Sequence, residues 1–447
     1  MHRSKIFSFV VQMSSILILV LYPVLVYAST VSDTDCTAEF DSGTDSDTQC
    51  SSGQVELDAT GKTNGSGDFT SRIFDAGSNA SWSSIAWTPY QPYLKELPDN
   101  EGVESAYAAG NLDMTNDVLL MHLNESSGAT SFTDSSGAGN NGSCDDANSH
   151  CPAVTTSGRF NNGFDFDGGD VITVLDDPSL QITGDLTIAA WVISTVTTSA
   201  NAQGILNKMY YDNYWGKNYG FSLAKNSANK YYVFIGTAAG ARTSVLSNSA
   251  YTDTNWHHIA AVHKSDNSIY LYIDGVKQTA TGSLALGSVN EDLDIGKLYG
   301  NYENYYWNGT IDEAVVVNAA LTDTQILDMY KRGANRLQFQ VRSCDDGACS
   351  GESFIGPDGS SGTYYSELTD ASTALPSKTL GNVSNNRYFQ YKAFLETSQS
   401  TISPALLDIT LTYGSLESVP EFSSGIYVMT IVFMVFYIGR RKDKIFV

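Results

Sequence analysis

The stretch NWHHIAAVHKSDNSIYLYIDGV, residues 255–276, carries three of the six histidines of this chain, His257, His258 and His263. Its second half, SIYLYIDG, alternates aliphatic residues with tyrosines and then reaches an Asp-Gly pair. Alternation with a period of two indicates a β-strand with one buried face, and Asp-Gly indicates a tight turn. Whether the three histidines share a metal ion depends on the backbone that carries them.

The surrounding residues supply that backbone through a resemblance. Between residues 118 and 333 the phrases VLLMHLNE, FTDSSGAGNNG, GFDFDGGDVITV, LTIAAWV, NWHHIAAVHK and WNGTIDEAVVVNAALTDTQILDMY follow one another in this order. As a set they resemble the laminin G-like jelly roll of the concanavalin A-like lectin and glucanase superfamily. The resemblance implies an all-β domain at residues 112–335, an antiparallel sandwich of two sheets with a dozen or so strands.

In that fold the phrase WHHIAAV is a strand, which decides the histidine question. Successive side chains on a strand point to opposite faces, so His257 and His258 cannot meet. His257 and His263 share a face but lie roughly 20 Å apart at about 3.3 Å per residue. A metal needs ligand atoms near 2 Å from it. We therefore expect structural histidines, as the family resemblance also implies for the tryptophan and one histidine of this phrase.

Short apolar stretches cut by Gly, Asn and Pro continue on both sides of the jelly roll, at residues 53–111 and 336–414. Such stretches indicate β-structure, and neither flank has enough strands for a stable sandwich of its own. We expect the two flanks to form one smaller β-sandwich, similar to galactose-binding-like modules, into which the jelly roll is inserted. Two independent small modules are the alternative.

One stretch of the body, LTDTQILDMYKRG at residues 321–333, has a helical pattern. Thr322 is the expected N-cap, and Ile326, Leu327 and Tyr330 form the apolar stripe.

Both ends of the chain carry targeting patterns. Residues 1–28 combine basic residues, an apolar run and small residues before a cut after Ala28, which is typical of a secretory signal peptide. Residues 29–52 are acidic and poor in apolar residues, so we expect a flexible lead-in. In the anchor tail, residues 415–447, the uncharged stretch 422–439 is long enough for a transmembrane helix and precedes a basic cluster. Val-Pro-Glu-Phe, apolar helix and basic tail resemble bacterial PEP-type sorting signals, although Phe422 stands where the commonest version has a second proline.

Charge and cysteine content indicate the cellular location of the protein and the classes of partner that it can bind. Of 25 basic and 49 acidic residues, six bases and one acid lie in the two end segments, leaving 19 and 48 in the body, a net charge of −29. Such a surface repels phosphates and excludes a nucleic-acid-binding role. The six cysteines form close pairs without zinc-site spacing, so we expect three local disulfides of an exported protein, Cys36–Cys50, Cys144–Cys151 and Cys344–Cys349. We expect residues 29–420 outside the cell, in the cell envelope and anchored in the membrane.

The resembled superfamily includes glycoside hydrolases, which use a pair of catalytic carboxylates. A retaining enzyme needs two carboxyl groups about 5–5.5 Å apart, and laminarinase-type members supply them as Glu-x-Asp-x-x-Glu. The nearest stretch here, EDLDIG from Glu291, lacks the second glutamate. We expect no catalytic residue; an unusual pair among Glu291, Asp294, Glu303 and Glu313 is the alternative.

Calcium is the one cofactor that the sequence suggests. The body is rich in oxygen ligands suited to this hard cation, and related sandwiches hold a structural calcium ion where the first segment meets the last strand. The matching positions are Asp134, Asn141 (or its neighbour Asn140) and Asp312. Ordinary turns, in which Asp and Asn side chains accept backbone N–H groups, are the alternative.

Two aromatic-rich stretches, residues 209–220 and 298–309, are candidates for ligand binding. Tyr and Trp beside Asn and Gly offer flat stacking faces and hydrogen-bonding groups for sugar rings or a peptide partner. The candidate residues are Tyr210, Tyr211, Tyr214, Trp215, Tyr302, Tyr305 and Tyr306. Trp307 is excluded because the resembled family packs this position inward. Edge loops without a ligand are the alternative.

Together these patterns predict a noncatalytic bacterial cell-surface protein for adhesion or carbohydrate binding, anchored in the membrane. Its expected partner is a carbohydrate or a cell-surface protein. A glycoside hydrolase and a purely structural envelope protein are the alternatives.

Overall fold

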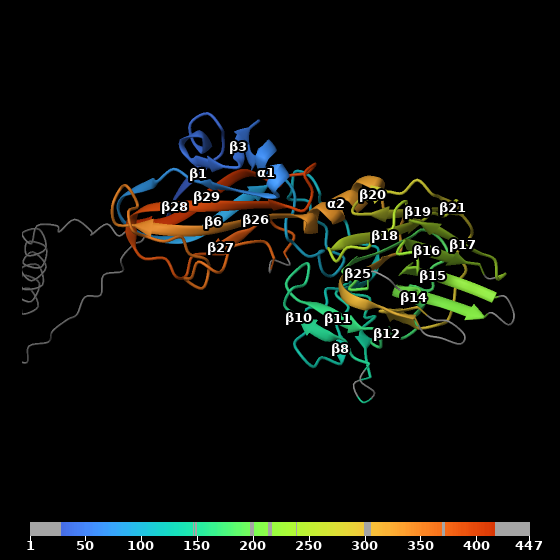
Figure 1. Ribbon diagram of the computed structural model, residues 1–447. Helices are drawn as coiled ribbons and strands as arrows, with labels where there is room; N and C mark the ends of the chain where they lie inside the picture. Colours follow the sequence, from blue (N-terminus) through green and yellow to red (C-terminus); the bar gives the residue numbers. More distant parts are fainter. Residues whose placement is uncertain are drawn as a thin grey trace, which may run out of the picture.

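The computed structural model describes residues 28–145, 147, 150–196, 201–212, 217–237, 239–298, 305–368 and 372–415. The chain forms two lobes, one on each side of helix α2 (Asp323–Ala334) (Figure 1). Strands dominate both lobes, which confirms the all-β class. The other helical elements given for the described residues are short: η1 (Phe40–Ser42), α1 (Ala59–Asn64) and η3 (Pro178–Leu180).

As far as the chain is described, the first lobe is built around a ten-stranded antiparallel sheet whose strands come from both flanks of the jelly roll. In its central order β2-β5-β28-β6-β29-β4-β3, the strands β28 and β29 from after the insertion lie between strands from before it, so neither flank completes the sheet by itself. One buried cluster, which includes Trp87, Phe339 and Tyr391, joins the two flanks. The strands are β1 (Ala28–Asp33), β2 (Thr44–Ser46), β3 (Thr48–Ser51), β4 (Gln54–Leu57), β5 (Ser66–Thr70), β6 (Phe74–Pro89), β26 (Asn335–Cys344), β27 (Ser377–Thr379), β28 (Asn386–Thr397) and β29 (Ala405–Ser415).

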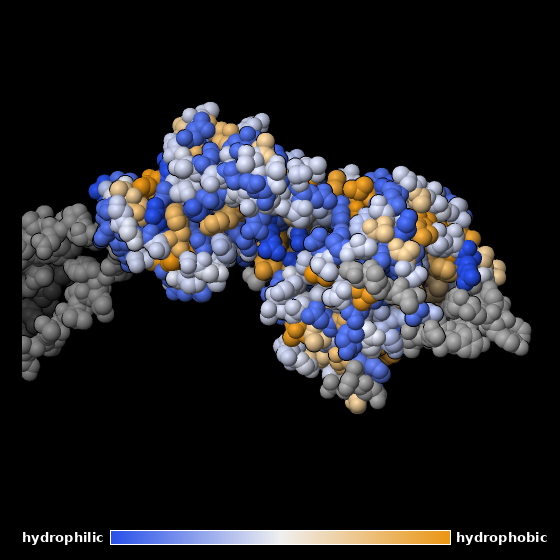
Figure 2. All heavy atoms as spheres, in the orientation of Figure 1, coloured by the Kyte–Doolittle hydropathy of each residue, from blue (hydrophilic) through white to orange (hydrophobic). Residues whose placement is uncertain are grey.

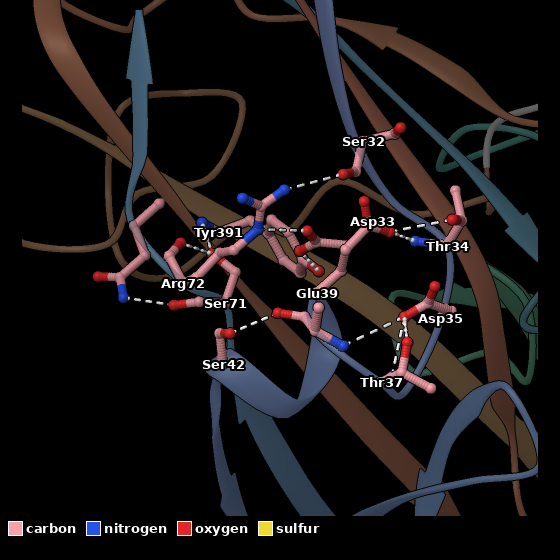
Figure 3. Close-up of polar contacts among 12 residues, drawn as sticks. Ser32, Asp33, Thr34, Asp35, Thr37, Glu39, Ser42, Ser71, Arg72 and Tyr391 are labelled. Carbon is pink, nitrogen blue, oxygen red and sulfur yellow. Dashed lines mark hydrogen bonds and ion pairs between the residues drawn. The ribbon is translucent and has the colours of Figure 1, made fainter.

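The segment expected to be a flexible lead-in, residues 29–52, is instead part of this lobe. Strand β1 pairs along its length with β29. The fully buried Asp33 carboxylate accepts hydrogen bonds from Arg72 Nε at 2.7 Å and from the Tyr391 hydroxyl at 3.0 Å (Figure 3). The acidic composition suggested solvent exposure, whereas the Arg72 cation between β5 and β6 and the Tyr391 phenol of β28 hold this acid inside.

The second lobe is the predicted sandwich of two antiparallel sheets. Among the described residues, one sheet has nine strands in the central order β10-β11-β25-β13-β18-β19-β20, with β7 on β25 and β21 on β19. The other has eight in the order β17-β16-β15-β14-β22-β12-β9-β8. Aliphatic and aromatic side chains from both sheets form one core around Trp307.

The nine-stranded sheet consists of β7 (Asp117–Met121), β10 (Ala153–Thr155), β11 (Gly163–Asp167), β13 (Leu186–Val192), β18 (His257–His263), β19 (Ser268–Ile273), β20 (Val276–Lys277), β21 (Gly282–Ser283) and β25 (Asn308–Val317). The eight-stranded sheet consists of β8 (Ser131–Phe132), β9 (Gly142–Ser143), β12 (Ile172–Val174), β14 (Gln203–Asp212), β15 (Lys217–Lys225), β16 (Tyr231–Gly236), β17 (Arg242–Leu246) and β22 (Leu293–Ile295). The strands β23 (Lys297–Leu298) and β24 (Tyr305–Tyr306) pair only with each other among the described residues, as a separate two-stranded ladder.

The three histidines of the opening stretch lie on strand β18, as predicted, and all are buried. His257 contacts the Asp274 carboxylate through Nδ1 at 2.8 Å, and His263 donates through Nδ1 to the Gly184 carbonyl at 2.7 Å. His258 packs beside Trp191. The three therefore have different neighbours and serve the packing of the sheet.

Helix α2 closes the outer surface of the nine-stranded sheet. Thr322 caps it, and the cap is reinforced by a reciprocal bond with Gln325, a capping box. Ile326 and Met329 pack on Ala260 and neighbouring residues of the sheet. The predicted cap is confirmed.

All six cysteines form the three predicted disulfides, which indicate an exported protein. On the face shown in Figure 2, hydrophobic residues lie in small groups among hydrophilic ones. Within the described ranges, no helix has both the length and the apolar character needed to span a membrane. The expected transmembrane stretch 422–439 lies outside those ranges, as does all of the expected signal peptide except Ala28.

Candidate ligand-binding face

The outward surface of the eight-stranded sheet carries a line of side chains that are mostly polar. Strand register places Thr173 beside Asp294, Asp294 beside Asn207, Asn207 beside Ser222, and Ser222 beside Phe234. Except for Lys208, their sequence neighbours belong to the core, so by alternation these five side chains point away from it. We call these five residues the polar row.

Two polar atoms of the row are buried without a partner in the protein. Asn207 Oδ1 and Ser222 Oγ have no hydrogen bond, and their residues are 2% and 0% exposed. The adjacent Asp294 accepts a bond from Thr173 Oγ1 at 2.8 Å and lies 3.0 Å from Lys297 Nζ. A buried polar group without a partner costs about 1–3 kcal/mol, so these two oxygens are the unsatisfied positions of the row.

The β23–β24 hairpin crosses this surface next to the row. A methyl group added to Gly204 of β14 would lie 2.1 Å from the Leu298 backbone nitrogen, so the hairpin rests directly on that strand. Burial, together with the nearby Tyr305 phenol, raises the pKa of Tyr232 to about 12. Tyr232 pairs with Ala224, the cross-strand partner of Gly204. Aromatic side chains therefore border the polar row on the hairpin side.

The two aromatic stretches predicted from sequence start from this same region. Tyr210 lies on β14, and Tyr305 and Tyr306 form β24, which contacts β14. Tyr210 stacks on Tyr219 at 5.8 Å between ring centroids, but alternation places it on the face of β14 opposite Asn207. Trp307 is fully buried in the core, as predicted. The side chain of Tyr211 and all of Tyr214, Trp215 and Tyr302 lie outside the described parts.

The candidate catalytic carboxylates do not converge where the structure describes them. Asp294 points outward from the eight-stranded sheet, whereas the Glu313 carboxylate lies on the outer side of the nine-stranded sheet, against His122. Facing sheets are about 10 Å apart, so these two carboxylates are farther from each other than either glycosidase geometry allows. Glu291 is exposed, and its backbone oxygen accepts a bond from Lys208. Glu303 lies outside the described residues.

The expected calcium ligands have protein partners. Asp134 accepts three backbone N–H groups, from Leu120, Ser136 and Asn140. Asn141 accepts the Asp134 N–H, and Asp312 Oδ2 accepts the Phe160 N–H at 2.9 Å. These bonds match the turn alternative for Asp134 and Asn141. Calcium binding by Asp134, Asn141 and Asp312 stays a prediction.

Sequence reasoning missed a different cluster, at the junction of the two lobes. One ligand atom each of Glu96, His122 and Glu313 lie within 4.8 Å of one another. His122 contacts Glu313 through Nδ1 and Asp99 through Nε2, the latter at 2.7 Å. Glu96 accepts a bond from Asn124 at 2.5 Å. Glu313 is 191 residues from His122 in sequence, so only the fold brings them together.

The electrostatics of this junction cluster follow from burial and from the number of carboxylates. Burial lowers the pKa of His122, but the adjacent Glu313 and Asp99 carboxylates outweigh it and raise this pKa well above its usual range. Burial and the charge of Glu313 raise the pKa of Glu96 to about 7. Burial, with Glu313 and Glu96 nearby, also raises the pKa of Asp312 well above its usual range. Acidic groups thus outnumber basic ones at this buried position.

Comparison with known proteins agrees with the lectin-like jelly roll. The sequence model of the concanavalin A-like lectin/glucanases superfamily (Laminin_G_3) matches residues 166–327. No curated protein matches the chain.

The solved structures that match this chain include binding domains and enzymes. The binding domain of Paraclostridial Mosquitocidal Protein 1 is 13% identical with a TM-score of 0.39, the match covering 52% of this chain and 62% of that domain. Domain 4 of AbnA, a GH43 extracellular arabinanase from Geobacillus stearothermophilus in complex with arabinotriose, is 17% identical with a TM-score of 0.38, covering 48% of this chain and 98% of that domain. Trypanosoma rangeli sialidase is 12% identical with a TM-score of 0.39, covering 53% of this chain and 36% of that protein.

Proposed function

We propose that this protein is an exported surface protein that binds carbohydrate through the polar row of its jelly roll, without catalysing a reaction. The observation that carries the proposal is the pair of unpartnered, buried oxygens on neighbouring strands, Asn207 Oδ1 and Ser222 Oγ. A sugar hydroxyl is both donor and acceptor, so it satisfies such oxygens. Phe234 continues the row with an aromatic ring on which a sugar ring can pack.

The shape and charge of the region indicate the kind of carbohydrate. The row crosses four adjacent strands from Asp294 to Phe234, a span of roughly 14 Å at about 4.8 Å per strand. That length suits an extended oligosaccharide better than a single sugar. The acidic body, with a chain net charge of −24, repels polyanions. We therefore expect neutral glycans to be preferred over sulfated ones.

A glycan array probed with the purified full-length protein tests the proposal. We expect retention on neutral oligosaccharides and its loss in Asn207→Leu, because leucine has a similar size but no hydrogen-bonding group. Because Asn207 Oδ1 has no partner in the protein, its replacement removes no hydrogen bond accepted by this oxygen. Asn382→Leu, an exposed site in the other lobe, is the matched control and is expected to bind like the unmodified protein.

Silence of the unmodified protein on glycans would contradict carbohydrate binding and would favour a surface-protein partner or a purely structural envelope role. Equal binding by Asn207→Leu would contradict the polar row as the site. Release of shortened sugars from a bound glycan would overturn the noncatalytic part of the proposal and support a glycoside hydrolase.

The proposal includes membrane anchoring by the stretch 422–439, with residues 29–420 outside the cell. It rests on the uncharged run followed by basic residues and on the similarity to PEP-type tails. Cell fractionation with and without residues 416–447 is the test. We expect the truncated protein in the medium or periplasm, and a truncated protein that stays with the membrane would contradict the anchor. The mass of the mature C-terminus would reveal cleavage by a sortase-like enzyme.

A further inference from the structure

A cluster of three metal-ligating side chains lies on the outer side of the nine-stranded sheet, away from the polar row. Glu96 belongs to the segment that leaves the first lobe, His122 follows strand β7, and Glu313 lies in β25. Their ligand atoms are within 4.8 Å of one another. We infer that Glu96, His122 and Glu313 form a binding site for a divalent transition-metal ion at the junction of the two lobes.

A β-bulge brings Glu313 to the cluster. Ala189 pairs with Val315 and Trp191 with Asp312, so two residues of β25 face the single residue between them on β13. Glu313 has a φ of 50°, in the left-handed region that non-glycine residues rarely adopt. The neighbours Ile311 and Ala314 still point into the core. The extra residue thus places two consecutive carboxylates, Asp312 and Glu313, outside the core, and bulges commonly re-aim side chains at sites.

The hydrogen bonds of His122 match those of a metal-bound histidine. Its Nε2 contacts the Asp99 carboxylate at 2.7 Å, while its Nδ1 faces Glu313. Metal-ligating histidines usually donate their second N–H to a carboxylate, which fixes the ring and makes the ligand nitrogen more basic. Asp99 is therefore a positioning residue, and Nδ1 is the atom offered to the ion.

The charge around the site calls for a cation. Glu96, Glu313 and Asp99 face the single imidazole of His122. The nearby Arg332 guanidinium pairs with the Glu104 carboxylate and gives Glu96 only a bond to its backbone oxygen. A divalent ion would neutralise the excess.

An independent observation concerns the residue next to Glu313. Asp312 is 0% exposed, and its Oδ1 has no hydrogen-bond partner in the protein. A carboxylate oxygen buried without donors is costly unless a cation or a water compensates it. It lies beside the proposed site in sequence and, like it, outside the core.

The donor set points to a class of metal. One imidazole nitrogen with two carboxylates suits zinc or manganese, whereas calcium prefers oxygen ligands alone. Because the three ligands come from three segments, the ion would hold the segment after β6 against the jelly roll. The role of the ion is to stabilise the junction of the two lobes. This inference does not depend on the carbohydrate proposal.

Equilibrium dialysis of metal-free full-length protein against Zn²⁺ or Mn²⁺, with elemental analysis, tests the site. We expect about one bound ion per chain and a higher melting temperature with metal, because binding to the folded state stabilises it. Glu96→Gln should remove both the bound ion and the rise in melting temperature, while its amide oxygen can still accept the Asn124 bond. His122→Gln should also remove both effects. Asp99→Asn should weaken binding about 10–100-fold, as loss of such a carboxylate does in known sites. Glu396→Gln, at an exposed glutamate, is the matched control and should bind normally.

Absence of binding by the unmodified protein would overturn the inference and leave His122 as a charged partner of carboxylates. Binding with equal stoichiometry in folded Glu96→Gln would also overturn it, by identifying adventitious surface ions. If His122→Gln fails to fold, Glu96→Gln decides the outcome, with its fold checked by circular dichroism.

Discussion

Replacing Arg332 by methionine would leave a buried carboxylate without its main partner at the junction of the lobes. Both side chains of the Arg332–Glu104 pair are almost fully buried, with 1% and 0% exposure. Arg332 also donates to the Glu96 backbone oxygen at 2.8 Å. Burial raises the pKa of Glu104, but the Arg332 charge outweighs it, so this pKa is lowered overall. The guanidinium thus keeps Glu104 ionised inside the protein.

The expected loss follows from these contacts. Removing one partner of a buried ion pair typically costs about 3–5 kcal/mol, because the remaining charge is desolvated and unpaired. Lys95 Nζ, 3.6 Å from Glu104, compensates part of the charge and favours the lower end, about 3 kcal/mol. Adding Glu104→Gln to Arg332→Met should recover part of the loss, since the amide carries no charge.

Urea unfolding followed by tryptophan fluorescence measures this difference. The matched control is Arg387→Met, which breaks an exposed pair with Asp75 whose side chains are 43% and 45% exposed. Exposed pairs contribute about 0–1 kcal/mol, so the control should change the unfolding free energy by less than that. Equal losses in Arg332→Met and Arg387→Met would refute the reasoning, as would a double variant less stable than Arg332→Met alone.

Three further outcomes are expected. Burial raises the pKa of Glu367 to about 7, so the folded state retains its proton at acidic pH. As the pH rises from about 4.5 to above 7, the contribution of this group to the unfolding free energy should fall by roughly 3 kcal/mol. Glu367→Gln should lose this fall, and equal pH profiles of the variant and the unmodified protein would contradict it. Gly309→Ala should lower the unfolding free energy by at least about 2 kcal/mol, because φ is 140° and the new methyl group would lie 2.0 Å from a backbone oxygen. The control is Gly184→Ala, whose new methyl group would have open space around it. Equal stability of the two variants would refute the reasoning. If Asp134 and Asp312 bind calcium, adding calcium to metal-free protein should raise the melting temperature, and Asp312→Asn should abolish that rise. Identical melting curves with and without calcium would leave these carboxylates as turn residues.

Local patterns were enough for features that depend on neighbouring residues. The alternation in SIYLYIDG predicted β19 and the turn after it, and Thr322 predicted the start of α2. Close cysteine spacing predicted all three disulfides. The composition of residues 29–52 predicted a flexible lead-in, because acidic stretches are usually exposed to solvent. The partners that bury Asp33 come from distant parts of the chain, so composition could not reveal them.

The candidate sites depended on contacts between distant segments. The aromatic stretches were visible in sequence, but the polar row was not, since Asn207, Ser222 and Asp294 each look ordinary in their own strands. The same holds for His122 and Glu313. In the sequence, His122 is part of a phrase that carries the family resemblance and Glu313 is a candidate catalytic carboxylate, and no local pattern relates one to the other.

By itself, the sequence determined the strand character, the helix cap, the cysteine pairs and the acidic surface, because each follows from side chains within a few residues or from composition. The tertiary structure decided which strands are neighbours, and therefore which polar groups meet. Register sets the polar row, and a bulge in β25 sets the junction cluster. Both arise because segments far apart in the sequence pack side by side in the sheets. No local sequence pattern specifies which distant segments become neighbours.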